Sequence, residues 1–123
     1  MHAGKKILVV EDDALIRDFI CDLLLSSGFD VSCCPDGASA VSAAARRIFD
    51  IVITDYNMPG ITGSEVAKCL RGHFPASIII GVSSDDRKED FLRAGADAFL
   101  QKPYGHADLI AIITREMTYS LLR

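Results

Sequence analysis

Five polar side chains in this sequence have the types needed for one reaction, provided that the fold brings them to one place. Asp55 follows a run of β-branched residues and precedes an Asn-Met-Pro-Gly turn signal, so it lies where a buried strand ends. Asp12 and Asp13, Ser83 and Lys102 each follow a short apolar run in the same way. The carboxyl ends of parallel strands meet at one edge of an open α/β sheet, and ligands bind there. We therefore expect these five side chains to share that edge.

This combination suits phosphoryl transfer. Three carboxylates at one edge repel one another and raise one another's pKa unless a cation joins them. Mg²⁺ is the expected cation, because it binds a few carboxylates, keeps several waters and accepts phosphate oxygens. Lys102 adds a fixed positive charge, and the Ser83 hydroxyl can bond an oxygen held between metal and nucleophile. A carboxylate can attack a phosphoryl group, and Asp55 would then become an aspartyl phosphate.

The elements that must position these residues alternate along the chain. Short apolar runs predict strands at residues 7–10, 31–34, 51–55, 78–82 and 98–101. Helical spacing or a high alanine content predicts helices at residues 14–27, 38–47, 63–73 and 106–122, with a shorter helix before Gly95. In the first helix, Leu15, Ile16 and Phe19 begin the apolar stripe expected to face the core. The alternation predicts an α/β fold with a parallel sheet covered by helices on both faces.

Length and composition narrow the class of protein. The 123 residues, 50% hydrophobic and 24% charged, suit a single globular domain. The net charge of −4 gives no sign of a nucleic-acid surface, and no apolar run approaches the roughly 18 residues that span a bilayer. The basic start of the chain is followed by too short an apolar segment for a secretory signal.

The four cysteines show no metal-binding or redox spacing. Cys21 and Cys69 fall within apolar helical patterns, where a free thiol behaves as a small hydrophobe. For the adjacent Cys33 and Cys34, a redox role is the less favoured interpretation. We therefore expect all four to be reduced and the chain to be cytoplasmic.

Taken together, these motifs resemble the receiver domain of bacterial two-component response regulators over essentially the whole chain. The resemblance is carried by Glu11-Asp12-Asp13, by Asp55 with Met58-Pro59-Gly60, by Ser83 and by Lys102-Pro103. It implies a flavodoxin-like, doubly wound fold, with five parallel strands in the order 2-1-3-4-5 and five helices. It also implies one receiver domain over residues 1–123, without an output domain.

The resemblance assigns a role to each site residue. Asp55 matches the phosphoacceptor, and Lys102 matches the lysine that pairs with the phosphoryl group. Asp12 and Asp13 match the acidic pair that holds Mg²⁺ together with Asp55, and Asn57 matches the residue whose backbone carbonyl reaches the metal. Taken alone, Asp13 would more often be a helix cap.

The resemblance also implies a switch in which Ser83 moves toward the phosphoryl group and the aromatic Phe99 changes rotamer. Read alone, Phe99 could equally be a core residue, and Ser84 is a second candidate for the hydroxyl. The segment from Ser83 to Gly95 is shorter than is usual in the family, which leaves the fourth helix, the output face and the mode of dimerisation open.

The function implied is a signalling switch. A sensor histidine kinase or a histidine phosphotransfer protein would supply the phosphoryl group to Asp55, and phosphorylation would change binding to a downstream protein or promote a dimer. The chain would catalyse only its own phosphorylation and slow dephosphorylation, with no direct contact to nucleic acid or membrane. Two alternatives stay open, a phosphorelay shuttle and a partner-binding scaffold that is never phosphorylated. A phosphatase of the haloacid-dehalogenase type is disfavoured because Asn57 stands where its second aspartate would be.

Overall fold

Strands and helices alternate along the chain as the hydrophobic pattern predicts. The computed structural model describes residues 4–122. The strands are β1 (Lys6–Val10), β2 (Asp30–Cys34), β3 (Ile51–Asp55), β4 (Ile78–Ser83) and β5 (Ala98–Gln101). The helices are α1 (Ala14–Ser26), α2 (Gly37–Ala44), α3 (Gly63–His73), α4 (Lys88–Arg93) and α5 (His106–Leu121). Helix α4 has only six residues, in keeping with the short segment before Gly95. No helix in the described part of the chain is long and apolar enough to cross a membrane.

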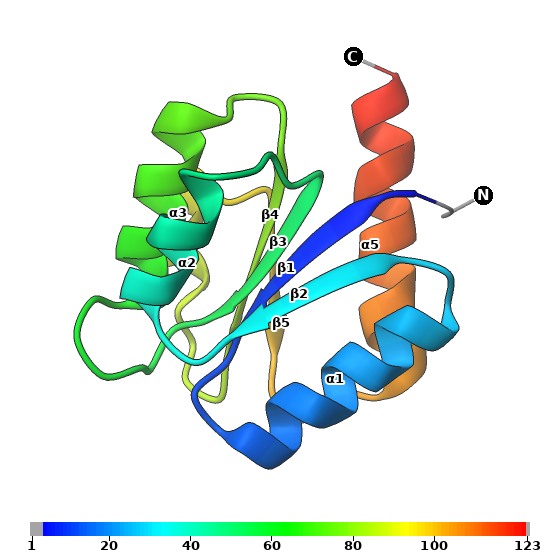
Figure 1. Cartoon of the computed structure of the whole chain (residues 1–123), viewed down its shortest axis with the longest axis horizontal. Coiled ribbons are helices and arrows are strands. Elements are labelled where there is room, and N and C mark those ends of the chain that lie inside the picture. Colours follow the sequence, from blue (N-terminus) through cyan, green and yellow to red (C-terminus); the bar gives the residue numbers. More distant parts are fainter. Residues whose placement is uncertain (1–3, 123) are drawn as a thin grey trace.

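All five strands are parallel, in the order β2-β1-β3-β4-β5. This is the predicted flavodoxin-like arrangement. Helices α1 and α5 cover one face of the sheet, and α2 and α3 cover the other (Figure 1). Alternate residues of each central strand face opposite layers, so that Ile7 and Val9 of β1 join one core cluster while Leu8 and Val10 join the other. The parallel arrangement brings the carboxyl ends of the strands to one edge.

The first helix departs from its predicted orientation. Ile20, Cys21 and Leu24 are buried against the sheet, whereas the side chains of Leu15 and Phe19 stay 82% and 52% exposed. The physical reason is position, because α1 begins beyond the end of β1, where no sheet lies beneath its first turns (Figure 1). The apolar pattern identified the helix correctly but not how much of it the sheet covers.

The cysteine prediction is wrong for two of the four residues. Cys21 on α1 and Cys33 on β2 are disulfide-bonded, with their Cα atoms 6.9 Å apart. Cys34 and Cys69 are free, as expected. The bonded pair is separated by 12 residues in sequence, and only the connection from α1 back to the edge strand β2 brings the two together. This bonded pair therefore gives no support to the expected reducing compartment.

A single arginine ties the amino-terminal ends of β4 and β5 to helix α3. The Arg71 guanidinium donates hydrogen bonds to the backbone carbonyls of Gly95, Pro75 and Ser77. It also pairs with the Asp97 carboxylate at 2.6 Å. A charged, planar donor with several N–H groups suits this cluster of carbonyls, which a lysine could not satisfy to the same extent.

Close packing of α4 on the sheet depends on a glycine. The fully buried Phe91 ring lies directly over Gly81 of β4, and a Cβ atom at Gly81 would overlap the ring. Phe91 also contacts the rings of Tyr56 and Phe99, with centroid distances of 5.8 and 5.9 Å. Gly81 therefore allows this short helix to lie against the sheet beside the loop that follows β3.

Candidate functional site at the carboxyl ends of the strands

Three carboxylates meet at this edge, namely Glu11 and Asp12 after β1 and Asp55 at the end of β3. We call these three residues the acidic cluster. One oxygen from each lies within 4.8 Å of the others. Glu11 and Asp55 are buried, with 3% and 8% exposure, and Asp12 is exposed. The cluster offers only oxygen ligands, and its exposed member leaves room for water. Both features fit Mg²⁺, which binds few carboxylates and retains several waters.

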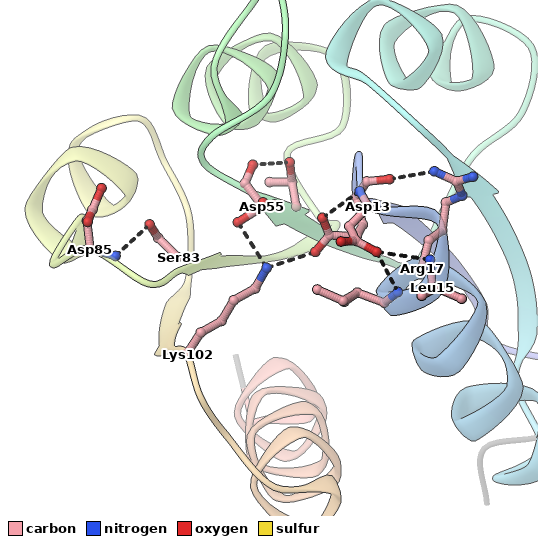
Figure 2. Close-up of polar contacts among 10 residues, drawn as sticks. Asp13, Leu15, Arg17, Asp55, Ser83, Asp85 and Lys102 are labelled. Atoms are coloured by element: carbon pink, nitrogen blue, oxygen red, sulfur yellow. Dashed lines mark hydrogen bonds and ion pairs between the residues drawn. The ribbon is translucent and has the colours of Figure 1, made fainter.

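Asp13 does not lie in this cluster. Its carboxylate accepts hydrogen bonds from the amides of Leu15 and Ile16 at 3.0 and 3.1 Å, so it caps α1 (Figure 2). Glu11 takes its place among the three acids, and the Glu11 carboxylate accepts a hydrogen bond from the Asp13 amide at 3.1 Å. An aspartate directly before a helical pattern is a typical N-cap, and this signal could have separated the two roles.

Lys102, which follows β5, neutralises part of this charge. Its Nζ atom lies 2.9 Å from Glu11 Oε1 and 3.5 Å from Asp55 Oδ1 (Figure 2). The Lys102 amide donates a hydrogen bond to the Ser83 carbonyl at 2.8 Å, which fixes the start of this loop against β4. Burial alone would lower the pKa of Lys102, but the neighbouring Glu11 and Asp55 carboxylates raise it. The lysine therefore stays a cation.

The surroundings of Asp55 disfavour its ionised form. Burial, followed by the Glu11 carboxylate, raises the pKa of Asp55 to about 6, against the opposing effect of the Lys102 cation. The ionised form is therefore costly in the absence of a further positive charge. A cation bound by the acidic cluster would offset this cost and leave Asp55 ionised as a nucleophile at neutral pH.

The two proposed switch residues lie on neighbouring strands. Ser83 is fully buried at the end of β4, and its Oγ accepts a hydrogen bond from the Asp85 amide at 3.1 Å (Figure 2). Ser84 is exposed. Phe99 on β5 is half-buried and packs against the core on the α4 side of the sheet. Ser83 thus lies at the carboxyl edge, whereas Phe99 pairs with Gly81, two residues before Ser83. The movement of both side chains stays a prediction.

The loop after β3 forms the open side of the site. Asn57, Tyr56 and Met58 line a shallow hollow beside Asp12, and the Asn57 side-chain amide lies 3.4 Å from Asp85 Oδ2. The role of the Asn57 backbone carbonyl as a metal ligand stays a prediction.

Two further residues that the sequence did not single out shape the site. The Arg17 guanidinium on α1 donates a hydrogen bond to the Glu11 carbonyl at 2.9 Å (Figure 2). Gly63, the first residue of α3, packs against the Asp55 carbonyl so closely that a Cβ atom would overlap it. Its amide donates a hydrogen bond to the Tyr56 carbonyl at 2.9 Å. A glycine at a helix start and an arginine within a helix carry no sequence signal of such contacts.

Comparison with known proteins places this site in a family. The family model for the response regulator receiver domain matches residues 7–114. The chain is 35% identical over 109 residues to the sensory transduction protein RegX3 of Mycolicibacterium smegmatis, covering 87% of this chain and 48% of that protein. It spans between 24% and 48% of the length of the curated relatives that it matches first.

Solved structures agree with the sequence matches. The chemotaxis protein CheY4 of Vibrio cholerae superposes with a TM-score of 0.86 at 30% identity, covering 92% of this chain and 98% of that one. The receiver domain of the sensor histidine kinase PA1611 from Pseudomonas aeruginosa superposes with a TM-score of 0.84 at 30% identity, covering 92% and 97%. That structure contains a magnesium ion coordinated in its active-site cleft. The chain thus belongs to the receiver domain family of two-component response regulators.

Proposed function

We propose that this receiver is a phosphorylation-dependent switch that accepts a phosphoryl group on Asp55 from a phosphohistidine donor. The observation that carries the proposal is the convergence of the acidic cluster and Lys102 around one buried carboxylate. Mg²⁺ held by Glu11, Asp12 and Asp55 would supply positive charge for the phosphoryl oxygens. The magnesium ion in the PA1611 receiver supports this choice of metal.

Asp55 and Lys102 are placed to carry out the transfer of the phosphoryl group. An Asp55 carboxylate oxygen attacks phosphorus, the new O–P bond forms, and the P–N bond to the donor histidine breaks with its electrons going to the imidazole nitrogen. Lys102 lies 3.5 Å from Asp55 Oδ1, close enough to pair with a phosphoryl oxygen placed there. Because Glu11 holds the same ammonium group at 2.9 Å, the lysine is positioned before the donor arrives.

The switch would begin at Ser83. A phosphoryl group brings a charge of about −1.5 to −2 and three acceptor oxygens, and the Ser83 hydroxyl could turn from its bond with the Asp85 amide to donate to one of them. Phe99, half-buried on the adjacent strand, could then move inward. The surface of α4, β5 and α5 would change for a downstream protein or for a second copy of the chain.

The family of the chain points to a histidine kinase or a histidine phosphotransfer protein as the donor, and a cytoplasmic location fits both. A phosphorelay shuttle would use the same residues and differ only in its next acceptor. A scaffold that is never phosphorylated is the remaining alternative, and the position of the Lys102 ammonium group 3.5 Å from Asp55 Oδ1 argues against it.

The decisive experiment is the intact mass of the protein after incubation with acetyl phosphate, with and without Mg²⁺. We expect an adduct of one phosphoryl group that depends on Mg²⁺ and is absent from the Asp55→Asn variant. The matched control is Asp18→Asn, which removes the same charge from an exposed position on α1 and should still form the adduct. If the wild-type protein forms no adduct under any condition, the phosphoacceptor assignment is wrong and the scaffold replaces it.

A further inference from the structure

We propose that Cys21 and Cys33 form a reversible thiol–disulfide modification site whose redox state sets the Mg²⁺ affinity of the acidic cluster. The effect on Mg²⁺ rests on the metal site of the proposed function. Small-molecule thiols and disulfides of the glutathione type are the chemical class that would exchange with this pair.

Only one half of the bonded pair is open to solvent. Cys21 is buried at 8% exposure on α1, whereas Cys33 is exposed on β2, the strand at the edge of the sheet. An incoming thiolate can therefore reach the Cys33 sulfur without opening the core. Access of this kind is what separates exchangeable disulfides from inert ones.

The exchange is balanced as two successive displacements. In the oxidising direction the Cys33 thiolate attacks one sulfur of a small-molecule disulfide, forms a mixed disulfide and releases one thiolate. The Cys21 thiolate then attacks the Cys33 sulfur, forms the Cys21–Cys33 bond and releases the second thiolate. The two protein thiols lose two protons and two electrons, and the small disulfide is reduced to two thiols. Reduction runs through the same steps in reverse.

The two remaining cysteines do not compete with Cys21 and Cys33 for this bond. Cys34 follows Cys33 directly, but it is buried with its sulfur 3.7 Å from the Val9 carbonyl. Burial, with a contribution from the Asp36 carboxylate, raises the pKa of Cys34 to about 11, so its thiol stays protonated and unreactive. Cys69 lies on α3, which packs on the opposite face of the sheet from α1.

The bond joins the two elements that hold the backbone of Glu11. On one side, the Glu11 amide donates a hydrogen bond to the carbonyl of Cys34, the neighbour of Cys33, at 3.1 Å. On the other side, Arg17 donates to the Glu11 carbonyl at 2.9 Å, and Arg17 lies four residues before Cys21 on α1. Breaking the disulfide removes one covalent constraint between α1 and β2, while their packing and the pairing of β2 with β1 remain. We expect the loss of this constraint to loosen the hold on Glu11 from both sides.

The proposal is tested on the full chain, equilibrated in glutathione buffers of graded oxidation and then freed of thiols by anaerobic gel filtration. Free thiols are counted after denaturation, and Mg²⁺ binding is measured by calorimetry with the metal alone. We expect the oxidised protein to retain two of its four thiols. Reduction should weaken Mg²⁺ binding by about threefold to tenfold, less than the roughly 10–100-fold that follows outright loss of a residue supporting a metal ligand.

Two variants separate this effect from general loosening of the protein. Cys33→Ser should bind Mg²⁺ with the weaker affinity in every buffer, and Cys69→Ser should respond to reduction as the wild type does. Four free thiols in every buffer would overturn the modification site. Equal Mg²⁺ affinity in the two redox states would overturn the coupling while leaving the proposed function intact. An absence of Mg²⁺ binding in both states would instead overturn the metal site and the coupling together.

Discussion

Asp55→Asn should make the unphosphorylated protein more stable at neutral pH, although it removes the residue on which the proposed activity depends. The reason is that Asp55 is buried and lies close to the Glu11 carboxylate, so its negative charge is costly in the folded state. Asparagine has almost the same shape and carries no charge. The ion pair between Lys102 and Glu11, with its distance of 2.9 Å, does not depend on Asp55 and should remain.

The size of the effect follows from the pKa. Folding raises the pKa of Asp55 from 3.8 to about 6, and each pKa unit corresponds to about 1.4 kcal/mol. The ionised carboxylate therefore lowers the free energy of unfolding by up to roughly 3 kcal/mol at pH 7.5. Since some of this cost is relieved by local rearrangement, we expect a gain of about 1–3 kcal/mol in the variant.

The sign and the pH window are fixed by the same values. A carboxyl group with a raised folded-state pKa binds its proton more tightly in the folded protein. Its favourable contribution to the free energy of unfolding is therefore fully present below pH 3.8 and is lost as the pH rises through about 6. The difference in the free energy of unfolding between the variant and the wild type should be largest at pH 7.5. It should fall to about half of that value at pH 5 and to about a fifth at pH 4.

The assay is urea unfolding without Mg²⁺, followed by circular dichroism at these three pH values. Asp18→Asn is the control, because it removes the same charge from an exposed position and should change stability by less than about 0.5 kcal/mol. A variant that is no more stable than wild type at pH 7.5, or a gain that does not shrink on acidification, would refute the electrostatic reasoning.

Three further predictions concern the metal and the packing around the sheet. Mg²⁺ at ten times its dissociation constant should stabilise the wild-type protein by about 1.4 kcal/mol in thermal or urea unfolding, and the Asp12→Asn variant should lose most of this gain. Equal stabilisation of the wild type and the variant would show that Asp12 is not a metal ligand. Arg71→Met should lower the free energy of unfolding by about 2–4 kcal/mol, because it removes a donor from three carbonyls and the cationic partner from the part-buried Asp97 carboxylate, which keeps its hydrogen bond from the Ile79 amide. As the control, Arg93→Met should lower the free energy of unfolding by less than about 0.5 kcal/mol, because Arg93 is exposed and only weakly paired. A similar loss of stability in the two variants would contradict the reasoning. Gly81→Ala should cost about 1–3 kcal/mol in urea unfolding, since its methyl group meets a buried ring. Gly72→Ala, in a helix with open space around it, should instead gain about 0.5–1 kcal/mol, and a gain at both glycines would show that the ring moves aside freely.

The sequence alone determined the architecture and the two central residues of the site. Buried parallel strands read as continuous apolar runs, so each strand end could be located from local pattern. The rule that parallel strands end at one edge then placed Asp55 and Lys102 together without any knowledge of distances, and the structure brings them to 3.5 Å. These inferences succeeded because each depends on period and order along the chain, which the sequence contains directly.

Only the tertiary structure decided the features that depend on side-chain direction or on distant partners. Glu11, and not Asp13, joins the acidic cluster because Asp13 turns back to cap α1. Cys21 meets Cys33 because α1 packs beside the edge strand. The exposure of Leu15 reflects where the sheet ends beneath α1. Hydrophobic periodicity specifies which face of an element is apolar, but neighbours are set by how the elements pack, and residues far apart in sequence carry no local signal of their contact.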